Sequence, residues 1–107
     1  MDAQLRALAE PTRREIFELV AGQELAAGEI AAHFRVSRPA ISQHLGVLRQ
    51  AGLVTERRDG VRRLYSADVS GLAGLKKFVD RFWSTRLNAL KAAAEQEGRS
   101  SRRKDVP

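Results

Sequence analysis

The segment from Leu25 to Tyr65 constrains the fold of this 107-residue chain more than any other part of it. It contains two short helical patterns separated by a tight turn, followed by two strand-like runs that meet at Asp59-Gly60. An Asp-Gly pair between two alternating runs is a strong signal for a two-residue hairpin turn. The segment therefore predicts a helix-turn-helix followed by a β wing.

Helical spacing of apolar residues predicts the elements on either side of this segment. A short helix covers residues 3–9. Pro11 then begins a helix that Gly22 ends, because proline fits a first helical turn and glycine a helix end. A longer helix covers about residues 72–96. The expected fold class is mainly α with a small β-hairpin, a winged helix-turn-helix in the order α-α-α-α-β-β-α.

The chain is expected to consist of one domain and a tail. Residues 1–97 can build one hydrophobic core but not two. Residues 98–107 lack apolar periodicity and carry four basic side chains against one acidic side chain, which predicts a disordered basic tail. No apolar run approaches the ~20 residues of a membrane span, and the N-terminus lacks a signal-peptide core. A cytoplasmic protein without a membrane partner is expected.

Positive charge is concentrated in the helix-turn-helix and the wing. Residues 34–67 carry seven basic and two acidic side chains, a net charge of +5, whereas residues 1–33 carry three basic and six acidic ones, a net charge of −3. Such a basic segment can meet a polyanion, and it can equally be a solvated surface with no partner. Charge alone does not decide between these readings.

The second helix of the helix-turn-helix carries side chains suited to DNA bases. Ser37 is a strong N-cap, and Pro39 fits the first turn behind it. The inward apolar stripe of this helix consists of Ile41, Leu45 and Leu48. Ser42 and Gln43 are left facing outward.

Each outward residue has a chemical role and a simpler alternative. Gln43 can bond an adenine edge through two hydrogen bonds, and Ser42 is short enough for close approach. Arg38 can reach guanine or a phosphate, and Pro39 can touch a thymine methyl in addition to starting the helix. His44 either contacts DNA or packs. The candidate DNA-contacting residues of this helix are Ser37, Arg38, Pro39, Ser42, Gln43 and His44.

The wing carries four arginines, namely Arg57, Arg58, Arg62 and Arg63. Because side chains alternate along a strand, they cannot all share a face. One set is expected to reach DNA while the other is solvated or paired with Glu56 and Asp59. Arg62 and Arg63 are the preferred contacts, since they lie nearest the tip of the predicted hairpin.

The last helix carries an apolar and aromatic stripe at helical spacing, consisting of Phe78, Phe82, Trp83, Leu87 and Leu90. The stripe is too wide to be covered by one small domain, which favours an interface with a second copy. A pocket for a small-molecule effector at that seam is the alternative.

Several stretches together resemble the ArsR/SmtB family of bacterial winged-helix repressors. They are Leu8–Ile16 (LAEPTRREI), Ile30–Phe34 (IAAHF), Val36–Leu45 (VSRPAISQHL), Leu48–Val54 (LRQAGLV) and the Gly60–Tyr65 wing. The resemblance covers about residues 3–92. It implies a homodimer built through the first and last helices, with Leu5 and Leu8 at the interface, that represses transcription by covering a promoter in double-stranded DNA.

The metal sensors familiar in that family have no counterpart here. Many members bind metal through cysteines at the start of the helix before the reading helix, where this chain has Ala26 and Gly28. Others use Asp and His pairs on the last helix, but no histidine follows His44. No metal and no cofactor are therefore expected. The Phe82-Trp83 pair more closely resembles a metal-independent branch, and any effector is an unknown small molecule.

The residues described above bear on three classes of function. The favoured one is a sequence-specific transcriptional repressor, autorepression included, that binds an inverted-repeat operator as a homodimer. The alternative is a winged-helix protein-interaction module that uses the same basic face on an acidic partner. An enzyme is not expected, because the chain has no cysteine, nucleophile motif, phosphate-binding loop or clustered acid-base set.

Overall fold

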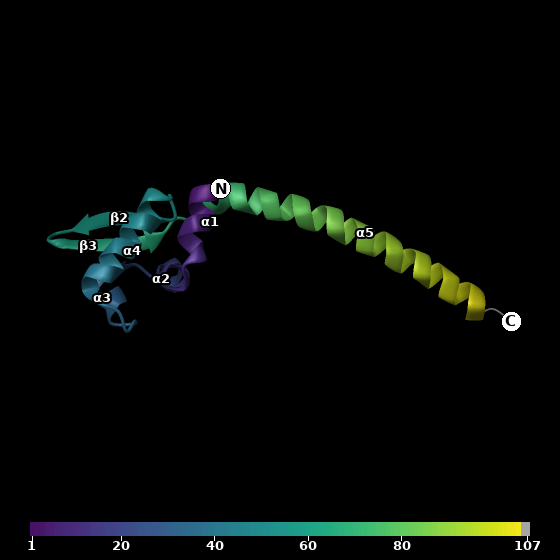
Figure 1. Cartoon of the computed structure of the whole chain (residues 1–107), viewed down its shortest axis with the longest axis horizontal. Helices are drawn as coiled ribbons and strands as arrows, with labels where there is room; N and C mark the ends of the chain where they lie inside the picture. Colours follow the sequence, from purple (N-terminus) through teal and green to yellow (C-terminus); the bar gives the residue numbers. More distant parts are fainter. Residues whose placement is uncertain (106–107) are drawn as a thin grey trace. The chain divides into compact units, whose positions relative to one another are not determined.

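The computed structural model describes the backbone of residues 1–105 and the side chains of residues 1–98. The chain divides into two compact units, Met1–Leu75 and Lys76–Pro107. The first unit contains four helices and a three-stranded sheet, and the second consists of most of one long helix (Figure 1). No helix in the described range is long and apolar enough to cross a membrane.

Helices α1 (Asp2–Ala9) and α2 (Pro11–Gly22) open the first unit, and Glu10 separates them with an extended backbone. The Glu10 carboxylate accepts a hydrogen bond from the backbone N–H of Arg13 at 2.8 Å and so caps α2. Pro11 occupies the first turn, where its missing N–H has no helical partner to lose. The predicted break between the two helices is confirmed.

The helix-turn-helix consists of α3 (Ala27–Ala31) and α4 (Arg38–Gln50). Helix α3 ends at Ala31, because the His33 N–H donates to the Ile30 carbonyl oxygen three residues back, a tighter spacing than in an α-helix. The predicted N-cap of α4 is confirmed, since the Ser37 hydroxyl accepts a hydrogen bond from the Ala40 N–H at 3.3 Å. The predicted inward stripe of α4 is also buried.

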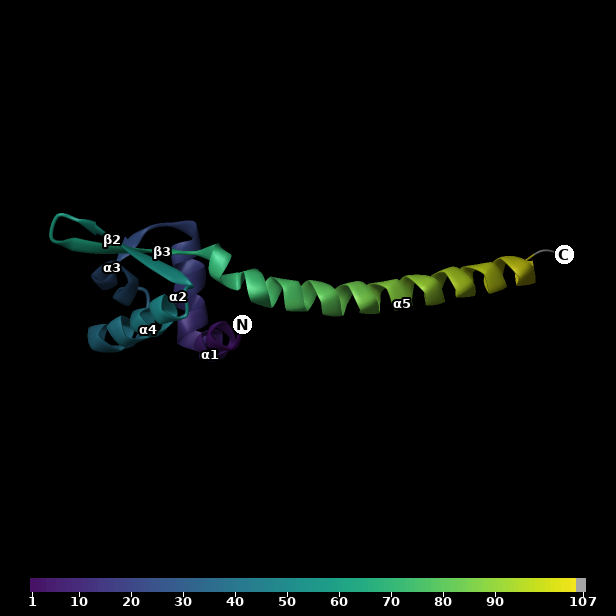
Figure 2. The same cartoon turned by 90° about the horizontal axis from the view of Figure 1, so that it is seen from above.

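The sheet has three antiparallel strands in the order β1-β3-β2: β1 (Leu25–Ala26), β2 (Val54–Asp59) and β3 (Arg62–Ala67). Strands β2 and β3 lie side by side and project from the core as the wing (Figures 1 and 2). The sequence predicts only these two strands. β1 is too short to show a period of its own and exists through its pairing with β3.

The wing turn lies one residue later than predicted. Asp59 pairs with Arg62, so Gly60 and Val61 form the turn instead of Asp59 and Gly60. Gly60 has a φ of +64°, the left-handed value that the first central position of a type II′ turn requires. This shift changes the cross-strand partners and not the faces, so Arg58 lies opposite Arg63 instead of Val61.

The hydrophobic core lies between α1, α2, α3, α4 and the sheet, and it has no buried polar side chain among the described residues. Its fully buried larger members are Ile16, Val20, Ile30, Ile41, Leu45, Leu48 and Leu53. After β3, the 3₁₀ turn η1 (Val69–Leu72) leads out of the first unit. At Gly71 in this turn, an added Cβ would lie 2.1 Å from the Gly52 carbonyl oxygen, so the two backbones touch.

Helix α5 (Ala73–Asp105) forms the rest of the described chain. It continues through residues 98–105, where the sequence predicts a disordered tail. Those residues lack an apolar stripe, but no proline interrupts them, and serine, arginine and lysine all tolerate helical backbone. Residues 106–107 of the predicted tail lie outside the described residues.

Candidate nucleic-acid interface

Helix α4 presents the predicted base-reading residues to solvent. Ser42 and Gln43 are exposed on it, whereas Ile41 beside them is buried in the core. Arg38 and Pro39 form its exposed first turn, which the Ser37 cap fixes in place. The structure thus brings five of the six candidates from this helix together on one open surface.

His44 lies apart from these five residues. Its side chain is 21% exposed, and its Nδ1 lies 3.4 Å from the Arg13 guanidinium and 4.0 Å from the Glu10 carboxylate. Arg13 also donates to the carbonyl oxygen of Ala7 at 2.7 Å, so it ties the end of α1 to α4. The geometry supports the packing role of His44 over a contact with DNA.

The Glu10 carboxylate at this junction is held in its charged form. The backbone N–H of Arg13 is the main cause that keeps the pKa of this carboxyl below its usual value. The same carboxylate caps α2 through this hydrogen bond.

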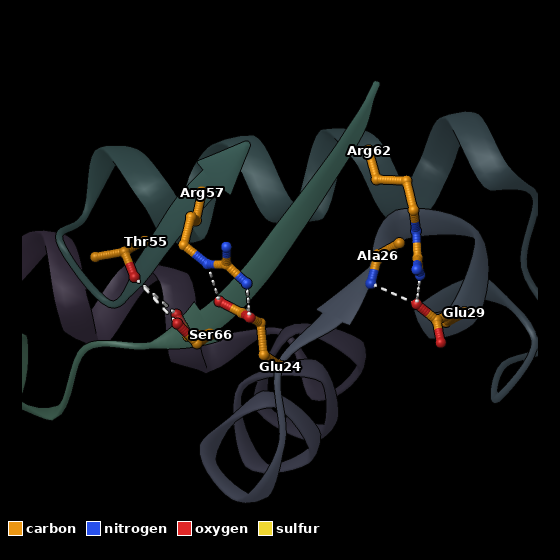
Figure 3. A network of polar contacts seen from close by, with 7 residues as sticks. All are labelled: Glu24, Ala26, Glu29, Thr55, Arg57, Arg62 and Ser66. Carbon is orange, nitrogen blue, oxygen red and sulfur yellow. Dashed lines mark hydrogen bonds and ion pairs between the residues drawn. The ribbon is translucent and has the colours of Figure 1, made fainter. Parts of the chain in front are cut away.

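One face of the wing is neutralised by carboxylates from outside the wing. Arg57 donates through two nitrogens to Glu24, at 2.6 and 3.1 Å, and Arg62 pairs with Glu29 (Figure 3). The prediction that one set of arginines would pair with Glu56 and Asp59 is wrong for Arg57 and Arg62, because the carboxylates that reach them are Glu24, just before β1, and Glu29 of α3. Arg57 lowers the pKa of Glu24, and Glu24 in turn raises the pKa of Arg57.

The other face of the wing carries Arg58 and Arg63, which are cross-strand partners. Glu56 on this face bonds Arg49 of α4 at 2.5 Å and lies 3.4 Å from Arg63. Within the described residues Arg58 has no ion-pair partner. Arg58 is the cation that the preference for the tip overlooked, although strand alternation alone places it on the opposite face from Arg57.

A groove of about 750 Å³ lies where the wing meets α3 and α4. Its lining includes the polar side chains of Glu29, Arg38, Ser42, Arg62 and Arg63, together with Gly28 and Tyr65. The guanidinium carbon of Arg38 lies 3.7 Å from the position that a Cβ on Gly28 would occupy. A Cβ at position 28 would therefore meet Arg38 only at ordinary contact distance, and three arginines line one groove. Such a groove suits a phosphate backbone.

The apolar stripe of α5 is open in the single chain. Its five predicted members are between 47% and 62% exposed. Phe82 and Trp83 stack edge to face, with ring centroids 5.8 Å apart, and the guanidinium of Arg86 lies 5.2 Å from the Phe82 centroid. Between Phe82 and Leu90 the helix surface has a hollow of about 500 Å³.

The two interface candidates on α1 differ from each other. Leu5 is 44% exposed, whereas Leu8 is partly buried and packs against the core of its own unit. Leu5 thus keeps more surface for a partner. No group of three or more His, Cys, Asp or Glu side chains that could hold a metal occurs among the described residues.

Comparison with known proteins agrees with this arrangement. Residues 10–56 match the sequence profile described as bacterial regulatory protein, arsR family. The HTH-type transcriptional regulator Rv2034 of Mycobacterium tuberculosis is 47% identical over 97 residues, which cover 91% of this chain and 91% of the relative. The transcriptional repressor SdpR of Bacillus subtilis is 40% identical over 72 residues, covering 67% and 80%. A crystal structure of a possible transcriptional regulator for arsenical resistance has 50% identity and a TM-score of 0.68, covering 84% and 94%.

Proposed function

We propose a repressor function from the premise that this chain belongs to the ArsR family of DNA-binding bacterial transcriptional regulators, which are not enzymes. The chain binds an inverted-repeat operator as a homodimer and excludes RNA polymerase from the promoter, its own promoter included. The observation that carries this proposal is the exposed Ser42-Gln43 pair of α4 beside a groove lined by three arginines.

The contacts divide into those that read sequence and those that hold the backbone. Gln43 bonds an adenine edge, and Ser42 lets α4 approach the major groove closely. Arg38 reaches a guanine or a phosphate from the start of α4. Arg62 and Arg63, which line the groove, bind phosphate, and Arg58, which has no ion-pair partner in the described part of the chain, adds a further cation to the same wing. Ser37 and Pro39 contribute mainly by placing the start of α4.

The homodimer is supported by the open stripe of α5. Five large apolar side chains at about half exposure are costly to leave in water, and a second copy is the partner that covers such a face symmetrically. Leu5 and, to a smaller degree, Leu8 extend the interface on α1. A symmetric pair places two reading helices in successive major grooves about 34–36 Å apart.

Release from DNA is assigned to a small apolar molecule and not to a metal. The hollow between Phe82 and Leu90 offers aromatic and aliphatic surface beside the dimer seam. A molecule seated there would compete with packing of the second copy. The chain contains no cysteine, so thiolate metal sensing is not part of this proposal.

A mobility-shift assay on the upstream region of the gene tests the proposal, with a scrambled duplex as competitor at several salt concentrations. We expect a shift that survives excess scrambled DNA, weakens as salt rises and is unaffected by Zn²⁺. Addition of fatty acids tests the apolar effector. No shift at low salt would reject the repressor and favour the protein-interaction module, and loss of binding with Zn²⁺ would overturn the metal-independent release.

A further inference from the structure

Glu29 places a negative charge inside the groove that is assigned above to the DNA backbone. We propose that Glu29 is a resident competitor of DNA phosphate, which must displace it from Arg62 before the wing can bind. The side chain therefore lowers the affinity of the chain for every DNA sequence. This inference rests on the proposed function, because it concerns the same groove.

The contacts of Glu29 show which interactions a phosphate would have to replace. Its Oε1 accepts a hydrogen bond from the backbone N–H of Ala26 at 3.0 Å and also pairs with the Arg62 guanidinium (Figure 3). The Glu29 and Arg62 side chains are 48% and 53% exposed, so solvent and an incoming anion can reach both. An exposed ion pair of this kind is weak enough to be exchanged for another anion.

The charges around the groove make Glu29 distinctive. Among the described residues that line it, Arg38, Arg62 and Arg63 are basic and Glu29 alone is acidic. A phosphate entering the groove thus meets three arginines, of which Arg62 is paired with Glu29 inside the groove and Arg63 lies 3.4 Å from Glu56, which does not line it. Because phosphate contacts carry no sequence information, Glu29 weakens specific and non-specific binding by the same factor.

The chain contains a matched control for this effect. Glu24 bonds Arg57 on the same face of the wing with the same chemistry, but neither side chain lines the groove. Glu24→Gln and Glu29→Gln both remove one negative charge from the chain. Glutamine at position 29 retains an oxygen that can accept from the Ala26 N–H, so the start of α3 is kept.

The test measures fluorescence anisotropy of the upstream duplex and of a random duplex with the full chain over a range of salt concentrations. For Glu29→Gln we expect about two- to fivefold tighter binding to both duplexes, the range that an exposed ion pair is worth. Its plot of log K against log salt should keep the wild-type slope, because Arg62 contacts phosphate in both complexes. Glu24→Gln should bind like the wild type.

Two results would overturn the inference while leaving the proposed function intact. The first is an unchanged affinity for Glu29→Gln when the wild type binds DNA normally. The second is an equal gain for Glu24→Gln, which would reduce the effect to net charge. A wild-type chain that binds neither duplex at low salt would instead reject the proposed function, and the inference with it.

Discussion

Gln43 and His44 are neighbours in the sequence, yet α4 gives them different surroundings. Gln43 is exposed, whereas His44 faces Arg13 and Glu10 at the junction of α1 and α2. Successive residues of a helix point about 100° apart, so a base-reading side chain and a packing side chain can adjoin. Residue type alone could not separate these roles for His44, because imidazole suits both.

Replacement of Gln43 by alanine tests the base-reading role. We expect the affinity for the operator to fall by about 5- to 150-fold, since a bidentate base contact is worth ~1–3 kcal/mol, with random DNA bound as before. Anisotropy titrations of both duplexes measure this. Gln50→Ala, at the exposed far end of the same helix, is the control and should change neither. Equal losses on both duplexes would remove Gln43 from the reading role.

Gly71 is predicted to be required for packing and not for conformation. A Cβ there would lie 2.1 Å from the Gly52 carbonyl oxygen, so Gly71→Ala should destabilise the fold by ~1–3 kcal/mol through overpacking. Gly46→Ala in α4 meets nothing within 4 Å and should stabilise it by ~0.5–1 kcal/mol through helix propensity. Urea unfolding of both variants checks the opposite signs, and a neutral Gly71→Ala would contradict the close contact.

At the scale of elements, local signals predicted the helices well and the sheet only in part. Ser37 and Pro11 mark the starts of α4 and α2 because capping and proline geometry act over a few residues. Strand β1 escaped prediction because its two residues are held by pairing with β3, about forty positions later in the chain. The one-residue shift of the wing turn changed the cross-strand partners but not the faces, so Arg58 lies opposite Arg63 instead of Val61.

The capping of α2 makes the stability of the first unit depend on pH. The pKa of Glu10 is lowered from 4.5, chiefly by the Arg13 backbone N–H. A depressed carboxyl pKa stabilises the fold above that ordinary value, and the contribution is lost as the pH falls through the lower folded value. We therefore expect the Tm to drop on acidification below about 4.5 in the wild type, and to drop less in Glu10→Gln.

Thermal unfolding monitored by circular dichroism between neutral and acidic pH measures this difference. Glu18→Gln in the same helix is the control, because in the described structure Glu18 has no hydrogen bond or ion pair through its side chain. The Tm of Glu18→Gln should fall on acidification as much as that of the wild type. An equal drop in Tm on acidification for Glu10→Gln and the wild type would show that the cap does not depend on the Glu10 charge.

At the scale of the whole molecule, the open stripe of α5 is the feature that a single chain leaves unexplained. Its helical spacing was readable from the sequence, and its exposure in the structure agrees with an interface. The partner that covers it was not readable, because apolar periodicity is the same for a core and for an interface. The extension of α5 to Asp105 was missed for a similar reason, since helical backbone needs no apolar stripe.

Leu87→Glu tests whether the stripe holds two copies together. A carboxylate in the middle of an apolar seam should shift the mass in solution from dimer toward monomer and weaken operator binding with it. Asn88→Glu is the control. Asn88 lies about 180° around the helix from the centre of the stripe, and its replacement adds the same charge. Light scattering coupled to gel filtration reads the mass. A Leu87→Glu variant that keeps the dimer mass would remove the stripe from the interface.

The central claim is that two copies read an inverted repeat through paired α4 helices. A hydroxyl-radical footprint of the upstream region of the gene tests it most directly. The account predicts two protected segments related by a two-fold axis, with centres about one helical turn, roughly 10 base pairs, apart. A single unsymmetric protected segment, or protection that a scrambled competitor removes equally, would contradict it.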